Sequence, residues 1–185
     1  MKAVHLNTIQ ELKSGKPQAQ EQVFKAFYAS LFRICQRYLV DYLLAEDCLM
    51  KGLMKMFQDI DSFRYENEES LFVWTRKICI NECLMELRRK TNFNLVLGEQ
   101  VPDIPLEESV LDKLSAKELL GLITQLPAGY RTVFNLYAIE GYSHQEIAQI
   151  LGTSESTSKT QFLKARTRLQ EWIKQGELYH EATGK

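Results

Sequence analysis

The sequence predicts an all-α protein in which a flexible linker joins two small helical domains. Apolar residues recur at spacings of three and four through most of the chain, as on the buried face of a helix. No segment alternates apolar and polar residues as a half-buried strand does. Residues 91–109 interrupt the helical pattern with glycine and proline, and they carry acidic side chains but no Lys or Arg. This composition is typical of an interdomain linker, so we expect domains over residues 1–90 and 110–185.

In the first domain the apolar pattern predicts helices with identifiable starts and buried faces. The expected helices cover residues 8–14, 18–39, 41–60 and 70–90, with a polar loop over 61–69. Asp41 is placed to cap the helix that follows it, because its carboxylate can accept an otherwise unpaired backbone N–H. Gly52 lies inside that helix, where it costs about 1 kcal/mol relative to Ala. We expect the helix over 18–39 to bury Val23, Phe24, Phe27, Leu31, Ile34, Cys35 and Tyr38.

The helix over 70–90 has two different faces. At about 100° per residue, the core face should contain Phe72, Cys79, Cys83 and Leu87, and the opposite face Trp74, Lys77, Asn81 and Arg88. An exposed Trp beside cations and an amide suits single-stranded nucleic acid, because the ring stacks on a base and the cations meet phosphate. The alternative is that Trp74 packs under the preceding loop.

The second domain is organised around residues 141–172. Its expected helices cover residues 111–125, 127–140, 143–151 and 154–172, with a frayed tail over 176–185. Ser143 and Glu146 form a capping box at the start of one helix, and Gly152 ends that helix. Ser154 is placed to cap the next helix. Two short helices with a tight turn between them are typical of a helix–turn–helix.

The last of these helices has one apolar and one polar face. We expect it to bury Phe162, Ala165, Leu169 and Trp172 and to expose Lys159, Thr160, Gln161 and Lys164. This division predicts that the polar face enters a DNA groove. The alternative is an ordinary helical hairpin with solvated lysines.

The charge balance points to a binding partner. The chain has 185 residues, a net charge of −1 and a sequence pI of about 6.3, which disfavours autonomous DNA binding. Basic residues gather instead within 88–90 and 159–168, and acidic residues gather within 99–118. We therefore expect the free chain to bind promoter duplex poorly and a partner to supply part of the affinity.

The remaining composition bounds the class of protein. No apolar run reaches the length of about 20 residues needed to span a bilayer, and the N-terminus lacks the apolar core of a signal peptide. We therefore expect a cytoplasmic protein without membrane insertion. Cys79 and Cys83 could form half of a metal site, but no second ligand pair accompanies them, and buried reduced thiols at Cys35, Cys48, Cys79 and Cys83 are the better interpretation. We expect no metal, no cofactor and no enzymatic activity.

These features together resemble the bacterial extracytoplasmic-function sigma factors, small initiation subunits of RNA polymerase in the sigma-70 family. In the first domain the resemblance rests on AEDCLMKGLMKMF (45–57), DSFR (61–64) and WTRKICINECLMELRRK (74–90). In the second it rests on LPAGYRTVFNLYAIEGYSHQEIAQILG followed by KARTRL. The chain departs from the family pattern at Met50 and Lys51, where Gln and Glu are usual, at Gly52, where a large apolar residue is usual, and at Ser156, where Gly is usual.

The resemblance implies a sigma region 2-like domain over 1–90 and a sigma region 4-like domain over 110–185. The first would bind core RNA polymerase and the −10 element of promoter DNA, with a flipped base held by the 61–70 loop. The second would bind the −35 element, and an anti-sigma factor is a probable further partner. The expected −10 contacts are Phe63, Arg64, Tyr65, Trp74, Lys77, Asn81 and Arg88. The expected −35 contacts are Lys159, Thr160, Gln161, Leu163, Lys164, Arg166, Arg131, Ser156 and Thr157. The expected core polymerase contacts are Glu46, Asp47, Met50, Lys51 and Met54.

Two other classes of function are compatible with parts of the sequence. A stand-alone helix–turn–helix regulator would carry a ligand pocket or a dimerising helix in its first domain, but no heptad run is present. A thiol-based enzyme would need a cysteine beside a histidine or a cation, and all four cysteines fall at core positions.

Overall fold

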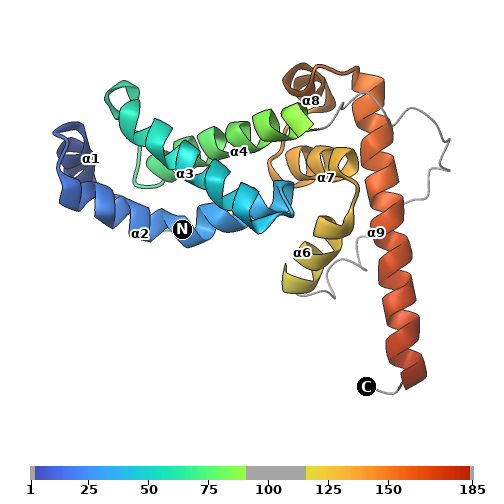
Figure 1. Ribbon diagram of the computed structural model, residues 1–185. Helices are drawn as coiled ribbons and strands as arrows, with labels where there is room; N and C mark the ends of the chain where they lie inside the picture. Colours follow the sequence, from blue (N-terminus) through green and yellow to red (C-terminus); the bar gives the residue numbers. More distant parts are fainter. Residues whose placement is uncertain (1–2, 91–115, 184–185) are drawn as a thin grey trace. The chain divides into compact units, whose positions relative to one another are not determined.

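The computed structural model describes residues 3–90 and 116–183 (Figure 1). Every regular element within these ranges is helical, so the predicted all-α fold is confirmed. The chain divides into two compact units, Met1–Lys90 and Thr91–Lys185. The predicted linker, residues 91–109, lies outside the described residues.

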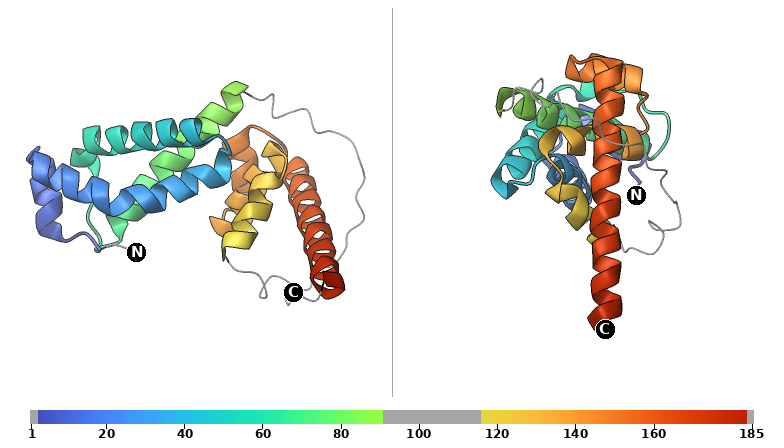
Figure 2. Two further views of the ribbon diagram at one scale, coloured as in Figure 1. Left: turned by 60° about the horizontal axis from the view of Figure 1, so that its bottom comes forward. Right: turned by 90° about the vertical axis from the view of Figure 1, so that its right-hand side faces the viewer.

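The first unit is built from three long helices and a short N-terminal one. Its elements are α1 (Leu6–Lys13), α2 (Pro17–Tyr38), α3 (Tyr42–Gln58), the 3-10 turn η1 (Ile60–Ser62) and α4 (Ser70–Lys90). Helices α2, α3 and α4 pack on one another, and Figure 2 shows α2 and α3 running side by side. The predicted stripe of α2 is buried except at Phe24 and Ile34, which are half-buried. Asp41 caps α3 as expected, because its Oδ1 accepts the Leu44 N–H at 3.1 Å.

Gly52 provides close contact between α3 and α4. A Cβ atom at this position would lie 2.5 Å from Cys79 Sγ and 3.1 Å from Cys79 Cα, well inside van der Waals contact. The sequence alone marks Gly52 as a cost to its helix. In the structure its missing side chain allows the two helices to approach.

The cysteine prediction is confirmed, because Cys35, Cys48, Cys79 and Cys83 are all free and buried. They come from α2, α3 and α4 and meet where these helices pack. Hydrogen bonding to Cys35 and burial both raise the pKa of Cys79, so this thiol stays protonated at neutral pH.

The second unit packs short helices against one long helix. Its elements are α6 (Ala116–Gln125), α7 (Ala128–Phe134), the π-helical turn η2 (Asn135–Ile139), α8 (His144–Leu151) and α9 (Glu155–Thr183). The core contains Ile123, Leu126, Tyr130, Phe134, Ala165 and Leu169. The expectation of a frayed tail from residue 176 is wrong, since α9 continues to Thr183. The π-helical turn η2, which follows α7 directly, was not predicted from the sequence.

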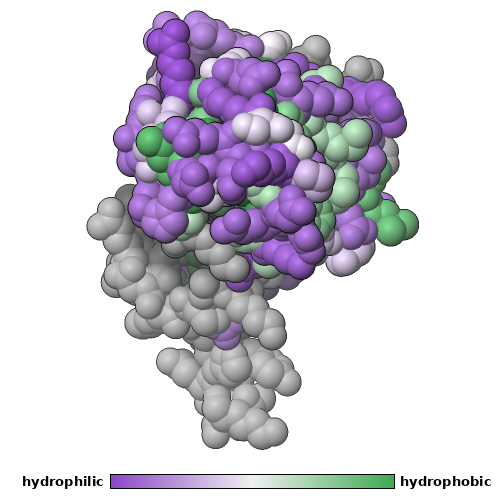
Figure 3. Space-filling model, turned by 90° about the vertical axis from the view of Figure 1, so that its left-hand side faces the viewer, coloured by the Kyte–Doolittle hydropathy of each residue, from purple (hydrophilic) through white to green (hydrophobic). Residues whose placement is uncertain are grey.

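The face of the molecule drawn in Figure 3 is largely polar. Figure 3 shows a face that is mostly hydrophilic and interrupted by small hydrophobic areas. Among the helices of the described ranges, none combines the length and the apolar character needed to cross a membrane.

Candidate nucleic-acid interface

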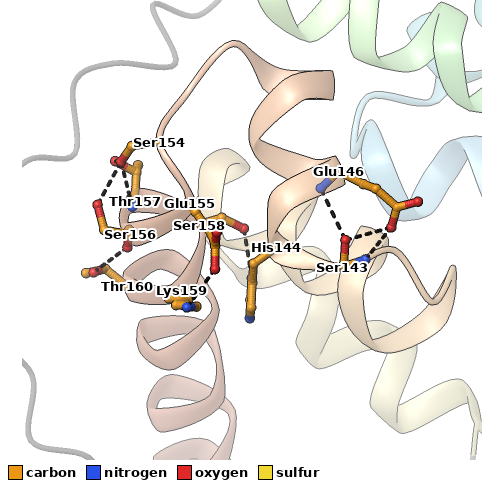
Figure 4. Close-up of polar contacts among 10 residues, drawn as sticks. All are labelled: Ser143, His144, Glu146, Ser154, Glu155, Ser156, Thr157, Ser158, Lys159 and Thr160. Carbon is orange, nitrogen blue, oxygen red and sulfur yellow. Dashed lines mark hydrogen bonds and ion pairs between the residues drawn. The ribbon is translucent and has the colours of Figure 1, made fainter.

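The helix–turn–helix begins with a complete capping box. Ser143 Oγ accepts the Glu146 N–H at 3.2 Å, and Glu146 Oε2 accepts the Ser143 N–H at 2.8 Å (Figure 4). These hydrogen bonds lower the pKa of Glu146, so the carboxylate that completes the box stays ionised. Helix α8 ends at Gly152, whose φ of 66° lies in the left-handed region that favours glycine. Both local predictions for α8 are confirmed.

The second helix of the motif is also capped as predicted. Ser154 Oγ accepts the Thr157 N–H at 3.0 Å and lies 2.8 Å from the hydroxyls of Ser156 and Thr157. Thr160 Oγ1 donates to the Ser156 carbonyl at 2.9 Å. Figure 4 shows these hydroxyls along one side of the first turns of α9. Hydroxyls of this kind can donate to phosphate oxygens and can donate to or accept from base edges.

Lys159 is exposed but is not isolated. Its Nζ lies 2.7 Å from Glu155 Oε1, one turn earlier, and the side chains are 61% and 50% exposed. The hydrogen bond and the charge of Lys159 lower the pKa of Glu155. The predicted basic segment 159–168 contains no acidic residue, and the prediction did not include Glu155, although the i, i+4 spacing of Glu155 and Lys159 is a signal in the sequence.

The expected −35 contacts differ in accessibility. Ser156, Lys159 and Thr160 are exposed, whereas Thr157, Leu163 and Arg166 are half-buried. The expectation that Gln161 and Lys164 are exposed is wrong: they are 3% and 5% exposed, because this side of α9 packs against other helices, and Gln161 lies beside Gly129 of α7. Arg131 is also buried, at 7% exposed. DNA contact by any of these residues remains a prediction, and the exposed residues are its best candidates.

Arg131 has a structural role that was not predicted from the sequence. Its Nη1 donates to the Leu126 carbonyl at 2.6 Å and to the Thr124 carbonyl at 3.3 Å, at the end of α6. Burial lowers its pKa, although a guanidinium remains charged at neutral pH. The cation thus satisfies helix-terminal carbonyls where α6 meets α7.

An aromatic cluster joins the recognition helix to the rest of the motif. The ring of His144 stacks on Tyr137 with 4.2 Å between centroids, and its Nδ1 lies 2.9 Å from Ser158 Oγ. Phe162 contacts the same two rings. Burial, and then the charge of Lys159, lower the pKa of His144. The histidine, absent from the sequence-based site, therefore fixes the start of α9 against α8.

In the first unit, some of the residues expected at the −10 element line an open pocket of about 430 Å³. The structure brings Phe63, Arg64, Trp74 and Lys77 to this pocket; Tyr65, Asn81 and Arg88 do not line it. Trp74 is half-buried, and its ring centroid lies 5.2 Å from that of Phe63. Trp74 thus packs on the preceding loop, as one of the two interpretations predicted, and still lines the pocket.

Polar residues of the loop complete the pocket, and sequence reasoning missed them. They are Ser62, Glu66, Asn67, Glu69 and Ser70. Asn67 Oδ1 accepts the Glu69 N–H at 3.0 Å, and Ser70 Oγ donates to the Asn67 carbonyl at 2.6 Å. The combination of Asn and Ser before a helix is a turn and cap signal that could have identified these residues.

The predicted polymerase-binding face of α3 is exposed and partly apolar. Met50 and Met54 are 39% and 57% exposed, and Lys51 pairs with Asp47 at 2.6 Å. Glu46 is half-buried and accepts a hydrogen bond from the Tyr28 hydroxyl at 2.7 Å, which raises the Tyr28 pKa to about 12. Leu43, beside this face, is 74% exposed and was not among the predicted contacts.

Comparison with known proteins covers both units. The family Sigma-70 region 2 matches residues 23–93, and the family Sigma-70, region 4 matches residues 116–169. The ECF RNA polymerase sigma factor SigM of Mycobacterium tuberculosis is 28% identical over 162 residues, which cover 84% of this chain and 78% of SigM. The chain belongs to the extracytoplasmic-function group of the sigma-70 family. A second relative, the sigma factor SigW of Bacillus subtilis, is 24% identical over 182 residues, covering 90% of this chain and 95% of SigW.

A solved sigma factor shares the fold. The sigma factor RpoE of Bartonella quintana, in its co-crystal structure with the anti-sigma factor NepR, is 25% identical with a TM-score of 0.50. The likeness covers 83% of this chain and 96% of that chain. Gly52, one of the departures from the family pattern expected from the resemblance, lies on the helix expected to bind polymerase. Because Gly52 faces Cys79, this departure alters the interior of the domain, whereas Met50 and Lys51 alter its surface.

Proposed function

We propose that this chain is a non-enzymatic initiation subunit that binds core RNA polymerase and directs it to promoters through their −35 and −10 elements. One observation carries the proposal: the chain contains, in this order, a pocket lined by Trp74, Arg64 and Lys77 within the region 2 match and a helix–turn–helix within the region 4 match. Bacterial transcription takes place in the cytoplasm, so the chain should work there.

The proposed −35 contact uses the first turns of α9. The capped start of this helix presents Ser156, Lys159 and Thr160 to solvent, and the dipole at a helix N-terminus favours phosphate nearby. Thr157, Gln161, Leu163, Lys164, Arg166 and Arg131 are the remaining proposed contacts. The stacked ring of His144 holds this segment in place, so the polar side chains meet DNA in a fixed arrangement.

The proposed −10 contact uses the pocket of the first unit. Trp74 offers a stacking surface for an unstacked base, and Arg64 and Lys77 lie at the same pocket to meet phosphate. Phe63 is only 6% exposed, so we propose that it supports Trp74 rather than stacking on a base itself. Tyr65, Asn81 and Arg88 would contact the strand outside the pocket.

The proposed polymerase contact lies on α3. Exposed Leu43, Met50 and Met54 would bury apolar surface against the partner, while Glu46, Asp47 and Lys51 would form its polar border. An anti-sigma factor, as in the solved relative, would inhibit this chain by covering that face, the −35 face or both.

The test is transcription by purified core polymerase with and without the chain on a library of promoter fragments. We expect promoter-specific transcripts only when the chain is present. Lys159→Ala should reduce promoter use about tenfold without altering affinity for core, because the loss of one DNA contact costs about 1–3 kcal/mol. Lys174→Ala removes an exposed lysine of the same helix beyond the recognition turns and serves as the control. The absence of stimulation on every fragment would contradict the proposal.

A variant of Glu155 tests the role of Lys159 by a change that should strengthen DNA binding. Glu155→Ala removes the carboxylate that pairs with Lys159 and that phosphate would repel. Binding of the holoenzyme to promoter duplex should therefore tighten, with a steeper salt dependence. Weaker binding would mean that Glu155, rather than Lys159, is needed at the DNA.

The alternative function, a stand-alone helix–turn–helix regulator, predicts a different DNA affinity for the free chain. A titration of labelled promoter duplex at one fixed salt concentration compares the free chain with the holoenzyme. The net charge of −1 predicts weak binding by the free chain. If the free chain bound as tightly as the holoenzyme, the stand-alone regulator would replace the sigma factor as the best description.

A further inference from the structure

The N-terminal segment of the chain holds the loop that lines the region 2 pocket, although the match to Sigma-70 region 2 begins only at residue 23. The Val4 N–H donates to the Glu68 carbonyl at 2.9 Å. Beside this bond, His5 Nδ1 lies 2.7 Å from Glu68 Oε1. Both the backbone and the side chain of Glu68, near the end of the loop, are therefore tied to the N-terminal segment.

Lys13 makes a second connection at the beginning of the same loop. Its Nζ donates to the Phe63 carbonyl at 2.9 Å and to the Asp61 carbonyl at 3.2 Å. Helix α1 packs against η1, and its own residues Ile9 and Leu12 are each 2% exposed, so the lysine extends from an anchored helix. Charge-assisted bonds to two carbonyls fix the backbone where the loop leaves the 3-10 turn.

These connections reach the pocket through the aromatic pair. Lys13 fixes the backbone of Phe63, whose buried ring packs on Trp74, and Trp74 lines the pocket together with Lys77. Asn67 and Ser70 fix the other end of the loop against α4. A loop held at both of its ends loses little entropy when it binds a ligand, so the pocket is preorganised.

We propose that the N-terminal segment Val4–Lys13 contributes to recognition of the −10 element. In this proposal Lys13 is a positioning residue that holds the 61–69 loop in the conformation that receives the flipped base. This inference rests on the proposed function, in which the pocket takes a base of the melted strand. It adds an element outside the region 2 match, and it assigns to Lys13 and His5 an effect on promoter opening and on base preference. Neither residue contacts the base in this proposal.

The experiment uses holoenzyme assembled from core polymerase and the full chain. Promoter opening is measured by the fluorescence of 2-aminopurine placed in the −10 element, and base preference by substituting each of the four bases at the captured position. Lys13→Met should reduce the opening equilibrium about tenfold, equivalent to about 1.4 kcal/mol, and should flatten the base preference. Binding of core polymerase and of −35 duplex should be unchanged.

Three further variants separate positioning from folding. Lys13→Arg keeps a cationic donor and should restore much of the opening. Lys16→Met removes a neighbouring lysine that pairs with Glu11 at 3.1 Å and should match the wild type. His5→Ala removes the Glu68 tether; because the His5 side chain is 75% exposed, the variant should fold normally and still alter base preference.

The outcomes are distinguishable. Normal opening and normal base preference in both Lys13→Met and His5→Ala would overturn the inference while leaving the sigma factor assignment intact. A Lys13→Met defect that simply tracks the fraction of unfolded protein, with His5→Ala unaffected, would also overturn it. Failure of the wild-type holoenzyme to open any promoter would instead refute the proposed function.

Discussion

Replacement of Gly52 by Ala is the sharpest test of how the first unit is packed. The new methyl group would lie 2.5 Å from Cys79 Sγ and 3.1 Å from Cys79 Cα, and the Cys79 side chain is fully buried. Overpacking of a well-packed core costs about 1–3 kcal/mol, and contact with backbone places this case in the upper part of that range. Ala in a helix recovers about 1 kcal/mol of intrinsic propensity. We expect a net loss of about 1–2 kcal/mol.

Thermal unfolding can measure this loss in one domain. The chain has 2 tryptophans, Trp74 in the first unit and Trp172 in the second. In a Trp172→Phe background, the fluorescence of Trp74 follows the first unit alone. A loss of 1–2 kcal/mol would lower its melting temperature by roughly 5–15 °C for a domain of this size.

Two further variants show whether the contact with Cys79 is responsible. Cys79→Ala removes Sγ, so the double variant should show a favourable coupling of about 1–2 kcal/mol between the two positions. Gly121→Ala, in α6, places a methyl group where no atom lies within 4 Å and should stabilise the second unit slightly. If Gly52→Ala leaves the first unit as stable as before or more stable, the close approach of α3 and α4 is not limiting and the reasoning fails.

Three other predictions concern the second unit, measured through Trp172 in a Trp74→Phe background. Ser143→Ala removes the capping acceptor of α8 and should cost about 1 kcal/mol in denaturant unfolding; an unchanged midpoint would contradict the capping argument. Arg131→Met leaves the carbonyls at the end of α6 without their donor and should cost about 1–3 kcal/mol; full stability in this variant would contradict the structural role, whatever its DNA affinity. The lowered pKa of His144 means that the folded unit binds fewer protons than the unfolded unit, so stability should be complete above about pH 6.5 and decline as pH falls through the folded pKa. His144→Gln should lose this part of the pH dependence, and identical pH profiles would show that His144 does not cause it.

The sequence by itself determined the features that depend on near neighbours. Helix starts at Asp41, Ser143 and Ser154 follow from hydrogen bonds to N–H groups three residues away, and each is present. The turn at Gly152 follows from a backbone conformation that glycine adopts without strain. Most of the buried stripe of α2 follows from the period of the helix. These signals lie within one or two turns, so no knowledge of the fold is needed to interpret them.

The tertiary structure decided what each helix face meets. Periodicity does not show that Gly52 lies against Cys79, that Arg131 reaches the end of α6 or that Lys13 holds the loop beside Trp74. Those contacts join residues on different helices or in separate segments, and they depend on helix rotation and approach at a packed interface. For the same reason, helical spacing alone could not show that Lys159 is exposed while Lys164 is buried. Local hydrogen bonding and helical period set the elements of this sigma factor, and packing between elements set the accessibility and positions of the side chains that its function would use.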